Sequence, residues 1–239
     1  MAKSAQEAIQ NLSQRMKNPD GLSDGQIRNR RSVYPKAATP DPKPRRRVAF
    51  DDLFKSEAGK VCQAYEVIPQ VACIVQYFLR DWKFGEGIVS NQPDLNKGLY
   101  VHGTFGTGKS MIFGIMHEIG RRLILEHGYQ GMWFTSVTAP WLVEEYMKST
   151  DRSYMGNFDF KSYTRGPLYI DDLGMERPAF GRDDVIADLL FERHRNQART
   201  FITSNLSPQS FSQKYGPRLG DRLPEAFNII EFTGKSYRE

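Results

Sequence analysis

The sequence contains few of the residues that build metal centres or disulfide frameworks. Cys62 and Cys73 are the only cysteines among 239 residues, and only four histidines accompany them. Two thiols without a Cys-x-x-Cys pair give a zinc site or a disulfide framework little to build on. We therefore expect both thiols to be reduced and packed, as is usual in the cytosol.

Long apolar runs are absent as well. No stretch approaches the roughly 18 uninterrupted apolar residues of a transmembrane helix, so we expect no membrane partner. The first ten residues, MAKSAQEAIQ, lack the apolar core of a secretory signal, which predicts a cytoplasmic protein. Hydrophobic residues nevertheless make up 39% of the chain, which is enough for a complete core.

Positive charge is concentrated near the N-terminus. Residues 1–50 hold eleven Lys and Arg against four Asp and Glu, a net charge of +7, whereas the whole chain carries +5. Within this segment, residues 2–17 predict a short, weakly amphipathic helix. The Pro-rich residues 18–44 predict a linker, which ends in three arginines at 45–47. Such an arm attracts nucleic acid through its phosphates or is a solvated tail without a partner, and the sequence leaves both open.

From residue 48 onward, short apolar runs alternate with longer helical segments. A mostly buried helix is expected over residues 66–83, with Pro69 in its first turn. The runs expected to be strands are residues 98–102, 131–137, 167–171, 200–204 and 228–232. The helices expected between them are residues 109–126, 138–149, 183–197 and 208–224. This alternation indicates one α/β domain over residues 48–239, with a mainly parallel five-stranded sheet flanked by helices.

A phosphate-binding loop follows the first of these strands. Residues 103–110, GTFGTGKS, match the pattern G-x-x-x-x-G-K-[ST] between a predicted strand and a predicted helix. Glycines allow backbone N–H groups to approach phosphate oxygens, and the helix N-terminus adds its partial positive charge. In this pattern the lysine lies between the β- and γ-phosphates, and the last hydroxyl binds Mg²⁺. The residues expected to contact the nucleotide are Gly103, Thr104, Phe105, Gly106, Thr107, Gly108, Lys109 and Ser110.

Two acids end a strand about sixty residues later. Asp171 and Asp172 directly follow the apolar run Leu168-Tyr169-Ile170. The first acid at such a strand end reaches the Mg²⁺ shell, so we expect Ser110 and Asp171 to hold the metal. The second acid, Asp172, can orient and deprotonate the attacking water. Carboxylates at strand ends also cap helices, but the phosphate-binding loop favours the catalytic interpretation.

Residues 98–239 resemble the DnaC/IstB-type branch of the AAA+ ATPases, which contains bacterial replicative-helicase loaders and ATPase helpers of transposases. The resemblance is carried by five segments in order: GLYVHGTFGTGKS (98–110), PLYIDDLG (167–174), FERHRNQARTFITSNLS (191–207), GDRL (220–223) and GKSYR (234–238). It implies a P-loop AAA+ domain that binds ATP and Mg²⁺, hydrolyses ATP and forms ATP-dependent homo-oligomers.

The resemblance also implies roles for single residues. Asn205 is similar to the sensor that hydrogen-bonds the γ-phosphate or the attacking water. Arg222 is similar to the arginine finger that acts on a neighbouring subunit's nucleotide, with Arg218 as its competitor. Arg238 is similar to a second sensor arginine, and Arg193 to an arginine that faces an adjacent subunit. The expected catalytic set is thus Lys109, Asp172, Asn205 and Arg222.

One departure from the family pattern concerns the second acid. Asp172 stands where most AAA+ proteins have Glu, and a side chain one methylene shorter has to hold the water closer, so slow turnover is expected. The function that the resemblance favours is loading of a replicative helicase onto single-stranded DNA. A transposition helper that binds double-stranded DNA and recruits a transposase is the first alternative. The second alternative is an ATP-gated adaptor with little hydrolysis, and the short side chain of Asp172 is the reason to consider it.

A possible DNA-binding segment lies at residues 138–166, where basic residues are interleaved with aromatic ones. The residues expected to contact DNA there are Lys148, Arg152, Tyr154, Phe158, Phe160, Lys161 and Arg165. Packing of the aromatic side chains against the core explains them equally well.

Overall fold

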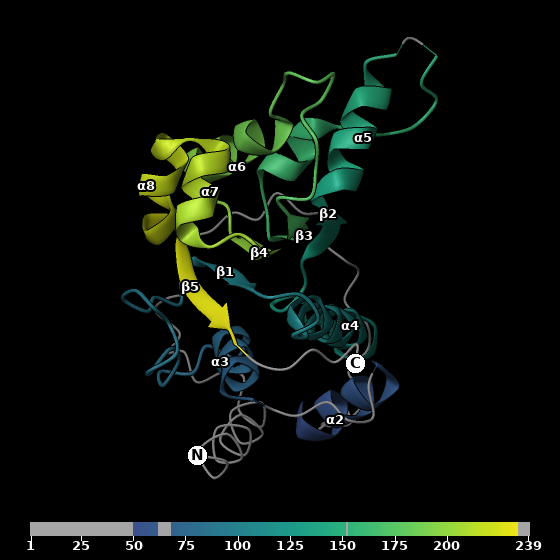
Figure 1. Ribbon diagram of the computed structural model, residues 1–239. Coiled ribbons are helices and arrows are strands. Elements are labelled where there is room, and N and C mark those ends of the chain that lie inside the picture. Colours follow the sequence, from purple (N-terminus) through teal and green to yellow (C-terminus); the bar gives the residue numbers. More distant parts are fainter. Residues whose placement is uncertain (1–49, 62–67, 152, 234–239) are drawn as a thin grey trace, which may run out of the picture. The chain divides into compact units, whose positions relative to one another are not determined.

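The computed structural model describes residues 50–61, 68–151 and 153–233 (Figure 1). The predicted helix over 2–17, the linker, Cys62, Arg152 and Arg238 lie outside these residues. The chain divides into two compact units, Met1–Tyr65 and Glu66–Glu239. Of the first unit the structure describes only helix α2 (Phe50–Val61). The expected boundary after residue 47 therefore stays a prediction.

The second unit contains a five-stranded sheet with the order β2-β3-β4-β1-β5, and every paired strand is parallel to its neighbour. The strands are β1 (Gly98–Gly103), β2 (Thr135–Thr138), β3 (Leu168–Leu173), β4 (Thr200–Ser204) and β5 (Phe227–Phe232). This confirms the predicted fold class. The strand expected over 131–137 starts only at Thr135.

Helices cover both faces of the sheet (Figure 1). Helices α3 (Pro69–Phe78) and α4 (Lys109–His127) lie on one face. On the other face lie α5 (Ala139–Ser149), α6 (Val185–Arg195), α7 (Pro208–Tyr215) and α8 (Pro217–Ala226). Strands buried on both faces explain why the strand segments are almost continuously apolar.

Side chains alternate between two cores along each strand. On β3, Tyr169 stacks on Phe113 of α4, with ring centroids 4.5 Å apart. Its neighbour Ile170 packs on the opposite side, in the core that α5, α6, α7 and α8 share. Asp171, two residues after Tyr169, therefore lies on the α4 side of the sheet, where the phosphate-binding loop begins.

The single helix predicted over 208–224 is wrong, because two helices occupy this segment. Gly216 has a φ of 91°, which no helix accommodates, and Pro217 starts the second helix. The helix predicted over 66–83 is also shorter than expected: it begins at Pro69, whose missing N–H suits the first turn, and ends at Phe78.

Candidate functional site

The phosphate-binding loop lies between β1, an interior strand of the sheet, and helix α4. Three of its residues need the left-handed conformation that glycine adopts at low cost: Gly103, Gly106 and Gly108, with φ of 145°, 78° and 88°. At Gly103 a Cβ atom would lie 2.2 Å from the carbonyl oxygen of Phe232 on β5, so no larger residue fits. The Thr107 hydroxyl donates to the Thr104 carbonyl oxygen across 3.0 Å and closes the loop on itself.

Lys109, the first residue of α4, is folded over this loop. Its side chain is buried, and its ammonium donates to the carbonyl oxygens of Gly103 at 2.9 Å and Thr104 at 2.6 Å. It also donates to Oδ1 of Asn205, the residue directly after β4, across 3.0 Å. Because β1 and β4 are neighbours in space but far apart in sequence, their carboxyl ends form the crevice at which open α/β sheets bind ligands.

Asp171 and Asp172 occupy the end of β3, next to the same crevice. The Ser110 hydroxyl donates to Oδ1 of Asp171 across 2.7 Å. The pairing of β3 with β4 is irregular between Ile170 and Leu173, and Asp172 has a φ of 53°. This local distortion turns the exposed Asp172 away from the ladder, and its backbone N–H donates to Oδ1 of Asp171 across 3.0 Å.

The hydroxyl of Ser110 and the carboxylate of Asp171 are chemically suited to bind a Mg²⁺ ion. Carboxylate and hydroxyl oxygens are the hard ligands that Mg²⁺ prefers, and nucleotide phosphates supply the rest of its shell. Because the Ser110 hydrogen points to Asp171, the lone pairs of that hydroxyl are directed elsewhere. Among the described residues no group of three or more His, Cys, Asp or Glu forms a metal centre that is independent of a nucleotide.

Two buried groups beside the loop are uncharged at neutral pH. Burial lowers the pKa of His102, directly before the loop, and the nearby charge of Glu231 opposes this only in part. Burial raises the pKa of Tyr169 well above its usual value, and the charge of Asp171 is the second-largest cause. Among the described residues, Lys109 and the two acids therefore contribute charge at the crevice.

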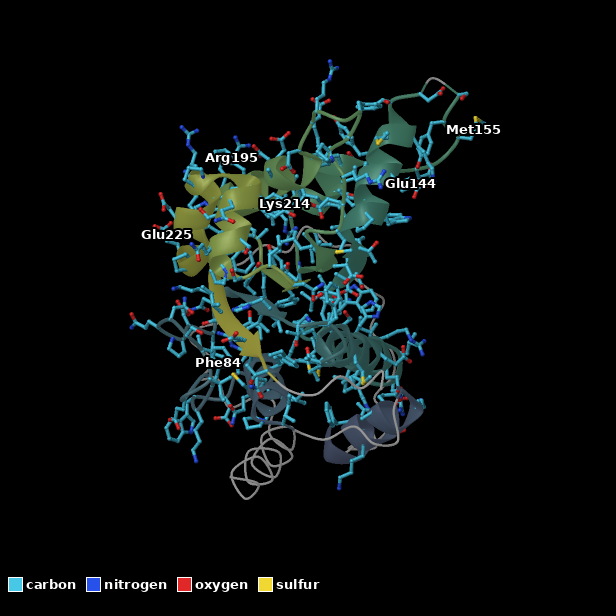
Figure 2. All side chains as sticks on the ribbon, viewed as in Figure 1. Phe84, Glu144, Met155, Arg195, Lys214 and Glu225 are labelled. Carbon is cyan, nitrogen blue, oxygen red and sulfur yellow. The ribbon has the colours of Figure 1, made fainter. Side chains whose placement is uncertain are left out.

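A buried carboxylate ties the loop after the acids to helix α7. Oε1 of Glu176 accepts from the Tyr215 hydroxyl at 2.5 Å and pairs with Nζ of Lys214 at 2.9 Å, while Oε2 accepts from the N–H of Gly174 at 2.8 Å. Figure 2 shows Lys214 at helix α7. Sequence reasoning missed Glu176, since an acid in a polar loop carries no periodic signal.

The candidate arginine finger is not part of this crevice in the single chain. Arg222 lies on α8 with its guanidinium 4.9 Å from the ring centre of Phe191 on α6, and Arg218 is exposed on the same helix. The action of Arg222 on the nucleotide of another subunit therefore stays a prediction. Nothing of Arg238 is described.

The expectation that Arg193 faces an adjacent subunit is wrong. Its side chain is among the most buried in the described chain, at 1% exposure. The guanidinium donates to the carbonyl oxygens of Gly166 and Arg199, each at 2.7 Å, to that of Tyr163, and to the Thr200 hydroxyl at 2.8 Å. Burial lowers its pKa to about 9, which leaves it charged at neutral pH. Arg193 therefore holds the segment before β3 against the start of β4.

Most aromatic side chains of the segment 138–166 pack on their own domain. Phe158 stacks on Tyr163 with ring centroids 5.5 Å apart, and Phe160 meets Tyr146 edge-on at 5.8 Å. The charge of Lys148 is paired with Glu144 at 2.7 Å and Glu145 at 3.0 Å, and the Tyr154 hydroxyl donates to Glu145. Lys161 and Arg165 remain exposed. The packing interpretation thus accounts for the aromatic residues of this segment.

No family model matches the chain. The replicative helicase loader DnaI of Bacillus subtilis (strain 168) is 32% identical over 127 residues, which is 52% of this chain but only 38% of that loader. A crystal structure of DnaI is 21% identical, with a TM-score of 0.48, and covers 77% of this chain and 94% of its own. The DnaC helicase loader is 16% identical, with a TM-score of 0.49, over 72% of this chain and 94% of its own.

Within the described residues, none of the helices has the length and apolar character that crossing a bilayer requires. The parallel sheet order, the phosphate-binding loop after β1 and the sequence similarity to DnaI together confirm the resemblance to the DnaC-type branch of the AAA+ ATPases.

Proposed function

We propose that this protein is a Mg²⁺-dependent ATPase of DNA replication that loads a replicative helicase onto single-stranded DNA. The observation that carries the ATPase part is the meeting of three strand ends: Lys109 after β1 contacts Asn205 after β4, and Ser110 contacts Asp171 on β3. The loader part rests on the similarity to DnaI.

In this proposal Lys109 exchanges the two loop carbonyls for the β- and γ-phosphates of ATP. Asn205, hydrogen-bonded to the Lys109 ammonium, then lies beside the γ-phosphate and orients the attacking water. Asp172, exposed at the strand end, accepts the proton of that water. Ser110 and Asp171 would hold Mg²⁺, whose charge would offset that of the transferring phosphoryl group.

Completion of the site requires a second copy of the chain. Arg222 is half-buried against Phe191, on the helices α6 and α8 rather than at its own phosphate-binding loop. A guanidinium presented by a neighbouring subunit can stabilise the charge of phosphoryl transfer, which is worth about 10³–10⁵ in rate where it operates. ATP binding would therefore favour assembly, and hydrolysis would reverse it.

The turn at Phe180 supports contact with single-stranded DNA better than the segment 138–166 does. Phe180 and Gly181 have successive positive φ values of 53° and 73°, and the N–H of Arg182 donates to the Ala179 carbonyl oxygen across 3.1 Å. This tight turn leaves Phe180 49% exposed, with Arg177 and Arg182 exposed in the same loop. A base can stack on such a ring while the arginines neutralise phosphates.

The DNA surface is tested by fluorescence anisotropy of a labelled oligo(dT) with ATP present. Phe180→Ala is expected to weaken binding about tenfold, since base–aromatic stacking is worth about 1–3 kcal/mol. Phe158→Ala serves as the comparison because its ring packs on Tyr163. If only Phe158→Ala lost affinity for the oligonucleotide, the DNA contact would lie in the segment 138–166 instead.

The partner is tested by trapping the ATP-bound protein. Asp172→Asn is expected to bind ATP and turn it over poorly, so it is immobilised with ATP and Mg²⁺, exposed to lysate of the source cells and analysed by mass spectrometry. Lys109→Ala is the nucleotide-blind control. Recovery of a hexameric replicative helicase only with Asp172→Asn supports loading, whereas a transposase in its place overturns it. Recovery of neither, with full cellular activity of Asp172→Asn, favours an ATP-gated adaptor.

A further inference from the structure

One oxygen of Asp171 accepts three hydrogen bonds. Ser110 donates to Oδ1 at 2.7 Å, the N–H of Asp172 at 3.0 Å, and the hydroxyl of Thr203 through a very short contact. The Tyr169 hydroxyl also hydrogen-bonds to this carboxylate. The carboxylate is thus held firmly through Oδ1 by groups on three elements.

Thr203 reaches Asp171 because of the sheet register. In the parallel pairing of β3 with β4, Ile170 is opposite Ile202, so that Thr203 on β4 comes next to Asp171 on β3. Tyr169 lies two residues before Asp171 on the same face, and its hydroxyl is 3.0 Å from that of Thr203. Both side chains are almost fully buried, at 1% exposure for Thr203 and 3% for Tyr169.

The directions of these hydrogen bonds follow from the number of hydrogens. A carboxylate only accepts, so the single hydroxyl hydrogen of Thr203 goes to Asp171. The Thr203 oxygen, 3.0 Å from the Tyr169 hydroxyl, can then accept from Tyr169, which also hydrogen-bonds to Asp171. The result is a chain of hydrogen bonds from Tyr169 through Thr203 to Asp171.

We propose that Thr203 and Tyr169 are positioning residues that fix the carboxylate of Asp171 in the orientation required to hold Mg²⁺. This inference rests on the proposed ATPase function. Without the Thr203 hydroxyl, two of the three donors to Oδ1 remain, and the carboxylate can rotate about its terminal torsion, which is intrinsically soft. The metal then has to order the carboxylate when it binds, so a higher Mg²⁺ concentration is needed.

The test measures how the affinity for a fluorescent ATP analogue depends on Mg²⁺. Thr203→Val keeps the shape and removes the donor, and is expected to raise the Mg²⁺ concentration at half effect about tenfold, since hydrogen bonds to charged groups contribute about 1.5–3 kcal/mol. Affinity for the analogue in EDTA should stay within about twofold, as should kcat at saturating Mg²⁺. Thr203→Ser should restore the wild-type Mg²⁺ dependence, and Tyr169→Phe should show a smaller shift in the same direction.

Thr200→Val is the matched control. Thr200 is buried on the same strand, and its hydroxyl donates to the Ala198 carbonyl oxygen and accepts from Arg193, away from the acids. This variant should lower the urea midpoint and leave the Mg²⁺ dependence unchanged. If Thr203→Val matches the wild type, or if both valine variants shift the Mg²⁺ dependence equally, the positioning role is wrong. If the wild-type protein does not bind the analogue at all, the ATPase proposal itself fails.

Discussion

The ammonium of Lys109 and the side-chain oxygen of Asn205 lie 3.0 Å apart, although 96 residues separate them in sequence. This contact joins the start of α4 to the end of β4. It places an uncharged amide beside the one buried lysine among the described residues of the crevice.

Replacement of these two residues should separate binding from turnover. Lys109→Ala removes the charge that faces the phosphates, and ATP affinity should fall about 100-fold or more. Asn205→Ala should change affinity less than about threefold but lower turnover about tenfold or more, because a group that orients water acts in the transition state. Fluorescent-nucleotide titration and phosphate-release kinetics measure the two effects. An equal loss of affinity in both variants would mean that Asn205 acts only by supporting Lys109.

Arg193 should be essential for stability. Arg193→Met deprives several buried carbonyl oxygens of their donor, so the free energy of unfolding should fall by about 3 kcal/mol or more. Arg193→Lys should recover only part of this, because an ammonium cannot reproduce the planar fork. Urea denaturation followed by circular dichroism measures the change.

Arg195 on the same helix provides the control for Arg193. Its side chain is 68% exposed and pairs with Glu192 at the surface. Arg195→Met should change the free energy of unfolding by less than about 1 kcal/mol. Similar losses in the two variants would show that the buried hydrogen bonds of Arg193 contribute no more than a surface ion pair.

Glu176 and Lys214 should be strongly coupled. Glu176→Gln leaves the Lys214 ammonium without its carboxylate, and Lys214→Met leaves a carboxylate with 3% side-chain exposure next to Tyr215. Each single change should destabilise the protein by about 2 kcal/mol or more, and the double variant should lose less than the sum of the two. A double-mutant cycle in urea measures this. Additive losses, within about 0.5 kcal/mol, would show that the pair is not coupled.

Cys73 should be unreactive in the folded protein. Its side chain is 2% exposed, and burial raises the pKa of the thiol to about 12, so almost no thiolate is present near neutral pH. In a Cys62→Ser background, Ellman's reagent should therefore react only after denaturant is added. Rapid reaction without denaturant would mean that α3 opens readily.

The sheet and the residues that follow its strands were predictable because each leaves a local pattern. Apolar runs bounded by turn residues indicated the strands, and the loop from Gly103 to Ser110 carries its own spacing. The break at Gly216 was missed because an amphipathic pattern continues across it. A glycine next to a proline is the signal that could have placed it.

The roles of Arg193, Thr203 and Glu176 could not be read from the sequence, because each depends on contacts between distant segments. An arginine in a helix is exposed far more often than buried, and nothing near Arg193 in sequence shows that carbonyl groups converge on it. Thr203 looks like an ordinary strand residue until the register with β3 is known.

The strand order also has a consequence for folding during synthesis. Strand β1, an interior strand of the sheet, pairs with β4 and β5, with Leu99 opposite Phe201 and Gly98 opposite Phe227. On the ribosome, β1 therefore emerges more than a hundred residues before its second neighbour, and its phosphate-binding loop cannot be braced against Phe232 until then. Pairing over such long sequence separations slows folding, so we expect the apolar segment Leu99-Tyr100-Val101 to need protection from aggregation until β4 and β5 have emerged.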